Sequence, residues 1–331
     1  MIEIKNDSKL VKLLAAQARY EKVDSDQAER ASKLIADLAA DPNPYNKYQI
    51  AQLIAFTVNE MVKPTTDWLT QVADTKYVGY GEKAAFKIKQ DGIRAFIQAR
   101  GATTARSKVS NKQVTLDTIA ISARPVINNY ELKTGRVQMA DLIRDAAQEM
   151  SNKEMQYIQG VLDTASSSWA TPFYGTGSGI VKATLNPMIQ HWMRTGAVSV
   201  LGDIAIISKL AEQTGFTAAT GTMQFSPNII DEFMRTGLIG TYYGAKVVNL
   251  VNPYQDDNVT PVINEKKLFI LPSAASADMR PLKVVFEGDV QFIDSTNIDD
   301  LSYEVRLDQF FGAGVVIGKT PCMSVYTDSA T

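Results

Sequence analysis

The residues that could carry covalent or metal chemistry are few in this chain. His191 is the single histidine, so a multi-histidine metal site is impossible. No G-x-S-x-G elbow accompanies it, as a Ser–His triad would need, and we expect a packing or surface histidine. Cys322 is the single cysteine and stands in an apolar run between Pro321 and Met323. It excludes an internal disulfide and predicts a buried, inert thiol.

Two glycine-rich strings partly match nucleotide-binding motifs. The string GAGVVIG holds Gly312, Gly314 and Gly318, but its third glycine is one place late and no helix follows. Small residues in a packed strand are the better explanation. The string YGTGSG at residues 174–179 has no lysine and hydroxyl residue in the register of a phosphate-binding loop, which favours a mobile surface loop.

Two pairs of adjacent aspartates complete the set of candidates. Neighbouring residues on a strand point to opposite faces, so Asp299 and Asp300 are not a catalytic pair. Asp256 and Asp257 precede Asn258, which is the composition of a solvated turn. We therefore predict no catalytic residues, no metal ligands and no cofactor, and an α/β metabolic enzyme is disfavoured.

Length and composition set the broad class of protein. The 331 residues are enough for about two domains with a real core, and 45% apolar and 21% charged residues are ordinary for a globular chain. The 34 basic and 36 acidic residues give a net charge of −2, which argues against sequence-wide nucleic-acid recognition. No stretch approaches the ~18 apolar residues of a membrane span, and residues 1–12 do not form a secretory signal.

Residues 1–63 have the pattern of three helical segments. Asp24 and Gln27 resemble a capping box at the start of the second segment, and Pro42 and Pro44 end it. Pro64 ends the third segment. Two placements remain open for these helices: a small autonomous three-helix module, or an arm that packs on other subunits.

The stretch from Gly79 to Val126 predicts a long two-stranded ribbon. Ile93, Ala95, Ile97 and Ala99 alternate with Arg94, Phe96, Gln98 and Arg100, which is the period of a strand. Gly101–Asn111 predicts an exposed tip, and a return strand begins at Val114. An isolated hairpin is only marginally stable in water, so this ribbon must be supported, and neighbouring copies of the chain are the expected support.

A long helix at 137–165 follows the ribbon, with a buried stripe that recurs every three or four residues. Short mixed elements occupy 166–281: strands at 203–207, 246–251 and 267–271, and helices at 209–213 and 227–234. They predict a compact α/β domain inserted into the chain. Strands at 282–286, 290–292, 303–307 and 314–317 then continue to Tyr326.

Charge is unevenly distributed between the ribbon and the C-terminal strands. Residues 83–112 hold eight basic side chains and one acid, Asp91, which is a local charge of +7. Residues 287–308 hold seven acids and one base, Arg306, which is a local charge of −6. The basic set is Lys83, Lys87, Lys89, Arg94, Arg100, Arg106, Lys108 and Lys112, and the acidic set is Glu287, Asp289, Asp294, Asp299, Asp300, Glu304 and Asp308. They are either two unrelated solvated faces or an inter-subunit contact of ribbon on strands, in which complementary charge steers association.

This order of elements resembles the major capsid protein of tailed double-stranded DNA bacteriophages, whose fold is shared with encapsulins and the herpesvirus capsid floor. The resembling stretches are ISARPVINNYELKTGRVQMADLIRDAAQEM at 121–150 and GLIGTYYGAKVVNLVNPY at 237–254. The resemblance implies an α+β fold with a helical N-terminal arm at 1–63 and an extended β-hairpin loop at 64–120. It further implies a peripheral domain at 121–168 and 280–331 with its spine helix at 137–165, and an axial domain at 169–279.

The resemblance also implies a function. A structural capsid subunit self-assembles into the hexamers and pentamers of an icosahedral phage head around double-stranded DNA, and an encapsulin-like nanocompartment shell is the alternative. The implied partners are the chain itself, a separate scaffolding protein, a portal, and DNA contacted without base reading, with no membrane. The expected location is the virion, after assembly in the host bacterial cytoplasm. Isopeptide cross-linking is not expected, because no motif singles out a lysine–asparagine pair.

Charge reversal tests the proposed contact between the ribbon and the acidic strands. We expect Lys87→Glu, Lys89→Glu and Arg94→Glu together to impair assembly and to leave the monomer folded, because the ribbon is solvated before association. Electron microscopy of the triple variant measures assembly, and circular dichroism measures the fold. Normal shells would dismiss the charge-complementarity hypothesis.

Overall fold

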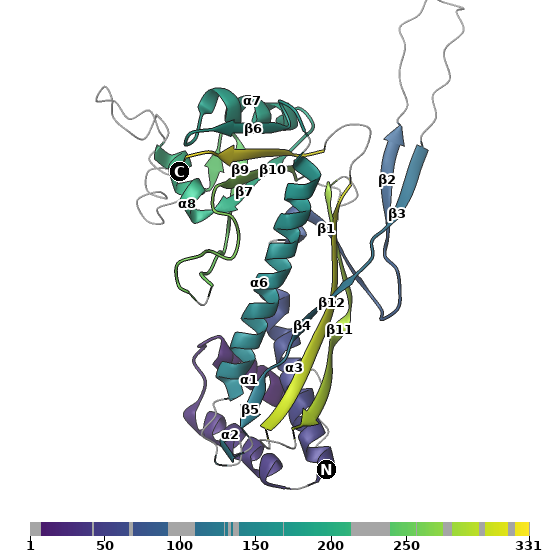
Figure 1. The fold of residues 1–331 in the computed structure, drawn as a ribbon, viewed down its shortest axis with the longest axis vertical. Coiled ribbons are helices and arrows are strands. Elements are labelled where there is room, and N and C mark those ends of the chain that lie inside the picture. The colour runs from purple at the N-terminus through teal and green to yellow at the C-terminus, as the bar shows by residue number, and fades with distance from the viewer. Residues whose placement is uncertain are drawn as a thin grey trace, which may run out of the picture.

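The computed structural model describes residues 8–41, 43–65, 69–91, 110–128, 130–131, 134, 139–167, 169–212, 239–255, 257–273, 280–297, 302–316 and 322–330. The molecule is elongated, with a long helix running between a small upper unit and a larger lower one (Figure 1). Its helices are α1 (Lys9–Ala18), α2 (Ser25–Ala40), α3 (Pro44–Thr65), α4 (Leu69–Val72), α6 (Met139–Ser166), α7 (Lys182–Met193) and α8 (Ile204–Glu212). None of the helices in these ranges is long and apolar enough to cross a membrane.

The lower unit is built on a sheet with the strand order β1-β11-β12-β4, to which β5 adds by pairing with β12. The bounds are β1 (Ala73–Val78), β4 (Ile119–Ala123), β5 (Val126–Asn128), β11 (Leu282–Thr296) and β12 (Ser302–Val315). Side chains alternate across β12: Val305, Leu307 and Phe311 join the core beneath α3 and α6. Arg306 and Asp308 point to the opposite side, which we call the outer face.

The predicted spine helix and N-terminal helices are confirmed, with small shifts at their ends. Asp24 caps α2 and accepts a hydrogen bond from the backbone N–H of Asp26. Pro44 begins α3 rather than only ending α2, because proline at the first helical position loses no hydrogen bond. The same helix runs to Thr65, one residue beyond its predicted end at Pro64.

The N-terminal helices lie on their own chain's spine. α3 packs against both α6 and β11, and α1 packs against α3 and α6. Val11, Ile54 and Val58 are buried in one core with Ile143 of α6 and Val284 of β11. Residues 8–65 are therefore part of the lower unit's core, and whether they also contact other subunits stays a prediction.

The upper unit is a second sheet with the order β6-β13-β10-β7-β9-β8, with its own core against α7 and α8. The bounds are β6 (Tyr174–Gly177), β7 (Val198–Asp203), β8 (Thr241–Tyr242), β9 (Ala245–Leu250), β10 (Lys267–Pro272) and β13 (Ser324–Asp328).

The strand predicted at 203–207 is wrong, since β7 ends at Asp203 and α8 begins at the next residue. The buried Asp203 carboxylate accepts the N–H of Ala205 and so starts the helix. The helix predicted at 227–234 lies outside the described residues.

The assignment of the whole segment 280–331 to the peripheral domain is also wrong. β13 leaves the lower sheet and pairs with β10 and β6 of the upper one. Tyr326 and Val325 are fully buried there. A strand's partner is chosen by long-range packing, which the local alternation of residues does not reveal.

Both glycine-rich strings of the sequence lie in strands or next to them. Gly312 lies in β12 where a Cβ would come within 2.8 Å of the carbonyl oxygen of Asp117, which confirms close packing. The string YGTGSG is not a mobile loop: Gly175 and Gly177 lie in β6, and Asp328 accepts the N–H of Gly179.

The remaining single residues also have packing roles. His191 lies edge-on to the rings of Phe173 and Trp192, at 5.3 and 5.0 Å between centroids. The Cys322 thiol is partly buried and donates to the carbonyl of Val316, and burial raises its pKa to about 12, as an inert thiol requires.

Candidate assembly surfaces

The predicted ribbon stands away from the body of the molecule (Figure 1). Its described part is the antiparallel pair β2 (Ala85–Asp91) and β3 (Ser110–Thr115), which forms a two-stranded sheet of its own. Phe86 pairs with Val114, and Lys87 with Gln113. The alternating residues at 93–100 and most of the predicted tip lie outside the described residues. The return strand is shorter than predicted, because β4 turns away from the ribbon to pair with β12.

An apolar cluster fixes the root of the ribbon on the outer face. Phe86 and Ala84 are buried against Val285 of β11, with Val78 and Leu116 packed around them. Because these contacts involve residues before and after the ribbon, both legs are held at the same place.

A buried ion pair lies beneath that cluster. The Lys283 ammonium is 2.8 Å from the Asp74 carboxylate, and the two side chains are 1% and 7% exposed. The same ammonium lies 5.7 Å from the Phe86 ring centroid, so the ribbon's own aromatic residue covers it. Removing two charges from water is costly, and each charge therefore depends on the other.

One carboxylate connects the two legs of the ribbon. Glu287 accepts the N–H of Gly81 at 2.8 Å and the hydroxyl of Thr118 at 2.5 Å. These hydrogen bonds, led by that from Thr118, hold the pKa of Glu287 below its ordinary value, so the carboxylate stays charged near neutral pH. Across the root, Lys83 pairs with Asp117 at 3.0 Å in solvent.

The structure places only part of the predicted basic set. Lys87 and Lys112 are exposed on β2 and β3, whereas Lys83 pairs within the root. Lys89 lies in β2, and its side chain is outside the described part of the chain. Arg94, Arg100, Arg106 and Lys108 lie outside the described residues altogether.

The acidic set is divided between two sides of the sheet. Glu304 pairs with Arg124, and Asp308 lies 2.9 Å from the Arg306 guanidinium, both on the outer face. Glu287 is on that face too, at the ribbon root.

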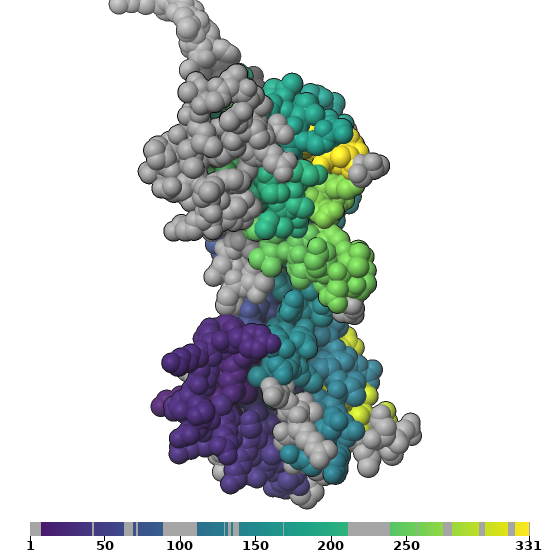
Figure 2. Space-filling view, turned by 90° about the vertical axis from the view of Figure 1, so that its left-hand side faces the viewer, coloured from purple at the N-terminus to yellow at the C-terminus, as the bar shows by residue number. Residues whose placement is uncertain are grey.

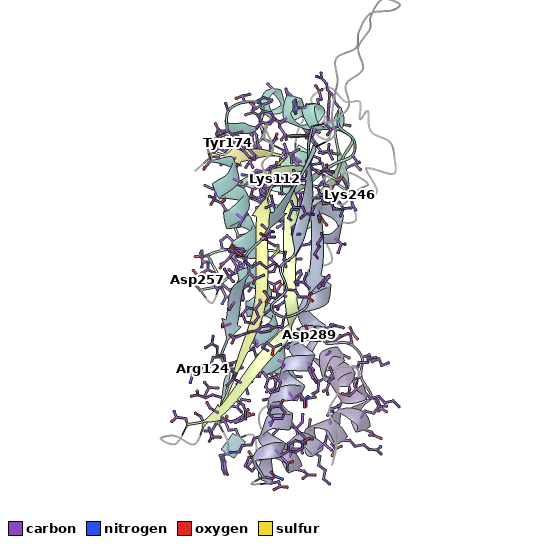
Figure 3. The ribbon with its side chains drawn as sticks, turned by 90° about the vertical axis from the view of Figure 1, so that its right-hand side faces the viewer. Lys112, Arg124, Tyr174, Lys246, Asp257 and Asp289 are labelled. Atoms are coloured by element: carbon purple, nitrogen blue, oxygen red, sulfur yellow. The ribbon has the colours of Figure 1, made fainter. Side chains whose placement is uncertain are left out.

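Two other acidic residues, Asp294 and Asp289, lie on the side of the sheet that the helices cover or at its edge. Asp294 accepts from the buried Tyr303 at 3.3 Å, and Asp289 from Asn59 of α3 at 3.0 Å. Asp299 and Asp300 lie outside the described residues. Figure 3 shows Lys112 on the upper part of the molecule and Asp289 and Arg124 in its lower half.

Sequence reasoning missed the buried ion pair beneath the ribbon root, although Glu287 and Lys83 at the root were in the predicted acidic and basic sets. Lys283 sits in the apolar run LKVVF, and a lone charge in a strand buried on both faces is a signal that a partner exists. Nothing local identifies Asp74 as that partner, since it is 209 residues away in sequence.

The spine helix carries a buried acid with no counterpart. Both carboxylate oxygens of Glu154 are buried and have no hydrogen-bond partner among the described residues. Burial raises the pKa of Glu154 to about 8. This side chain lies one turn from Met150 and Ile158, which belong to the main core.

Comparison with known proteins gives one family. The sequence model of the family described as SPbeta prophage-derived putative capsid protein YonB matches residues 1–327. A search of curated proteins gave no match.

Solved structures of low sequence identity share the fold. The capsid of an empty GTA particle is 12% identical with a TM-score of 0.54, covering 80% of this chain and 90% of that chain. The structure from Microbacterium phage Oxtober96 is 13% identical in sequence with a TM-score of 0.53, and the match covers 77% of this chain and 89% of that chain. The mature capsid of bacteriophage PhiM1 is 9% identical with a TM-score of 0.50, covering 77% and 85%. At these identities the similarity shows the α+β capsid fold.

Breaking the buried ion pair should destabilise the chain more than breaking the exposed one. Asp74→Ala removes the carboxylate that lies 2.8 Å from the buried Lys283 ammonium, and we expect a loss of about 3–5 kcal/mol in the free energy of unfolding. Replacing both, with Asp74→Leu and Lys283→Met, should recover most of it. Lys83→Ala at the solvent-exposed pair, whose side chains are 70% and 86% exposed, is the control, with an expected loss below about 1 kcal/mol. Urea unfolding measures all three, and equal losses for the single variants would contradict this.

Glu154 should make folding stability depend on pH. The folded chain binds this proton more tightly than the unfolded chain, whose carboxyl titrates near its ordinary pKa. The stabilisation is therefore complete below that pKa and is lost as pH rises to about 8. We expect the thermal midpoint of the wild type to fall between pH 5 and 8, and that of Glu154→Gln to fall less. Glu149→Gln, on the exposed side of the same helix, should leave the wild-type slope unchanged. Identical slopes for the wild type and Glu154→Gln would contradict the expectation.

Proposed function

The chain belongs to the YonB family of prophage-derived capsid proteins, and we propose that it is the major shell subunit of a tailed-phage head. In this proposal it self-assembles into the hexamers and pentamers of an icosahedral shell that encloses double-stranded DNA. Its work is association between subunits and not a chemical reaction.

One observation carries the proposal: among the described residues, the ribbon formed by β2 and β3 packs against the rest of its own chain at the root. β2 and β3 pair with each other and with no other strand of the described chain. Phe86 and Ala84 are buried at the root, whereas Lys87 and residues 111–113 are exposed. A two-stranded hairpin is marginal alone, so association with another copy supplies the missing contacts.

The charges favour an oriented contact. The exposed Lys87 and Lys112 suit an acidic surface, and Glu304 and Asp308, whose side chains are 13% and 15% exposed, contribute part of one on the outer face of another copy. Such a contact sets orientation and association rate more than affinity. We further propose that residues 169–279 with β13 form the axial domain around the five-fold and six-fold axes, and that residues 8–65 contact a neighbour.

The other partners follow from this role. We propose a separate scaffolding protein, a portal and packaged DNA that is contacted through its backbone, with assembly in the host bacterial cytoplasm and residence in the virion. The family match favours this phage head over an encapsulin-like shell, which would have the same fold.

Electron microscopy of the purified chain tests the proposal. We expect capsomers or closed shells, because the exposed ribbon makes the single chain incomplete. Shells that carry a co-purified enzyme would instead favour the nanocompartment. Monodisperse particles of one to four subunits, at all protein concentrations and with scaffold supplied, would overturn both.

A further inference from the structure

The core of the lower unit holds an acidic side chain in apolar surroundings. Glu154 lies in the buried stripe of α6 and is 1% exposed, one turn from Met150 and Ile158. Neither of its carboxylate oxygens has a hydrogen-bond partner among the described residues. A carboxylate in such a site loses its hydration without compensation, whereas a protonated carboxyl costs much less to bury. The packing of this core is therefore that of the neutral side chain.

A second polar group lies at the same level of this core. Tyr157 of α6 packs edge-on to Phe311 of β12, with 6.0 Å between ring centroids. Glu154 comes three residues before Tyr157 and Gln309 two residues before Phe311, and α6 and β12 both run upward in Figure 1. Gln309 has the same parity as Phe311 on β12, so it points toward the helices.

The Gln309 side chain is 7% exposed, and its amide oxygen is also without a partner in the described part of the chain. The amide oxygen and the two carboxylate oxygens are all acceptors. A proton on Glu154 therefore supplies a donor to a group of buried acceptors, and its loss leaves three acceptors and a charge.

Open hollows lie on both sides of Glu154 along the helix. Its neighbour Met155 lines a hollow of about 470 Å³ with Arg144, and its other neighbour, Lys153, lines a hollow of about 920 Å³ between α6 and β4. Figure 2 views the side of the first hollow, with the N-terminal helices in purple below and the segment after β9 in green above. Among the described residues, one basic side chain and no acid lines each hollow. A charged Glu154 that turned to either side would meet water and a cation.

Burial is the cause that raises the pKa of Glu154, and the charged groups on the elements packed against α6 are directed elsewhere. Glu304, Arg306 and Asp308 lie on the outer face of β12, and Tyr303 donates to the carbonyl of Lys47. The described titratable side chains of α1 and α3 are exposed or partly exposed, and β4 has none: Lys9, Lys12, Tyr45, Lys47, Tyr48 and Glu60. The side chain of Lys63 in α3 lies outside the described residues.

The contact of α6 with the sheet is continuous with the ribbon root. Phe311, which contacts Tyr157, also contacts Phe286 of β11 at 5.1 Å between centroids. The neighbouring residue of β11, Val285, lies on the outer face and is buried against Phe86 of the ribbon. Because a close-packed layer transmits displacement, movement of α6 at Glu154 would loosen the strand that fixes the ribbon.

We propose that Glu154 is a proton-operated switch of the spine helix. With its proton, Glu154 keeps α6 closed on β12 and donates a hydrogen bond to Gln309. When the proton passes to solvent, the helix opens around Glu154 toward one of the two hollows, where water and Arg144 or Lys153 stabilise the carboxylate. The closed form holds the ribbon root in place for association, and this last link rests on the proposed function.

Hydrogen exchange of the folded chain, below the protein concentration at which it assembles, tests the switch at about pH 6 and about pH 8. The opening equilibrium rises about tenfold per pH unit over the range in which the closed form holds the proton and the open form does not. We expect the protection factors of residues 150–158 to fall about a hundredfold across these two units in the wild type. They should stay level in Glu154→Gln and in Glu154→Met, neither of which ionises.

A comparison within the molecule separates a switch from a general loss of stability. Strands β7 and β10 of the upper unit have their own core and should keep their protection at both pH values. Glu149→Gln, on the exposed side of α6, is the matched control and should behave as the wild type. An equal fall in α6 and in these strands would overturn the switch, as would an equal fall in the wild type and in both Glu154 variants.

Assembly of the same variants tests the link to the ribbon. We expect the wild type to need about tenfold more protein for assembly at about pH 8 than at about pH 6, and Glu154→Gln to need the same at both. A wild-type threshold that does not change with pH would overturn this link and leave the proposed function intact. A chain that never forms shells would overturn the proposed function, while hydrogen exchange would still decide the switch.

Discussion

The architecture depends on how the described part of the ribbon, β2 and β3, is held at its root. A ribbon with polar groups on both faces cannot bury enough apolar surface to order itself, so its direction must be set by its root. The chain does this with an apolar cluster around Phe86, a buried ion pair between Lys283 and Asp74, and the Glu287 carboxylate that joins both legs. Each of the three uses β11, so that strand determines where the ribbon points.

The same strand also joins the ribbon to the spine. On its other side Val284 and Phe286 share one core with α3 and α6. A displacement of the ribbon root would therefore be transmitted to the spine helix through a close-packed layer. The buried Glu154 shows that this layer is not optimised for stability alone, since an unpaired acid in a core helix costs free energy whenever it is ionised.

How much of this could be predicted from the sequence differs by element. The spine helix was predicted to within two residues at each end, because a 28-residue apolar stripe leaves little choice of period. β2 and β3 lie in the stretch that was predicted as a ribbon, whereas the alternation at 93–100 and most of the tip, on which that prediction was based, lie outside the described residues. β13 was assigned to the wrong sheet because the alternation of SVYTD fits a strand in either sheet. Its place is fixed by pairing with β6 and β10, which the local sequence does not reveal.

The candidate surfaces were harder to predict, for a related reason. Local charge counts predicted a single acidic patch, but Asp294 is on the helical side and bonded to Tyr303. The pleat of a strand sends alternate residues to opposite faces, and a count over consecutive residues ignores this.

The partners found for the acidic residues bear on how subunits would associate. Glu304 and Asp308 already pair with Arg124 and Arg306 of their own chain, and their side chains are only 13% and 15% exposed, so an ion pair with a neighbour's lysine would add little free energy. Complementary charge on these strands would then contribute orientation and little affinity. In the proposed assembly, the free energy of association then comes mainly from apolar groups that are solvated in the single chain and ordered beforehand. Among the described residues, such groups include Val126 of β5 and Ile293 of β11, which are 54% and 65% exposed on strands that pair with β12.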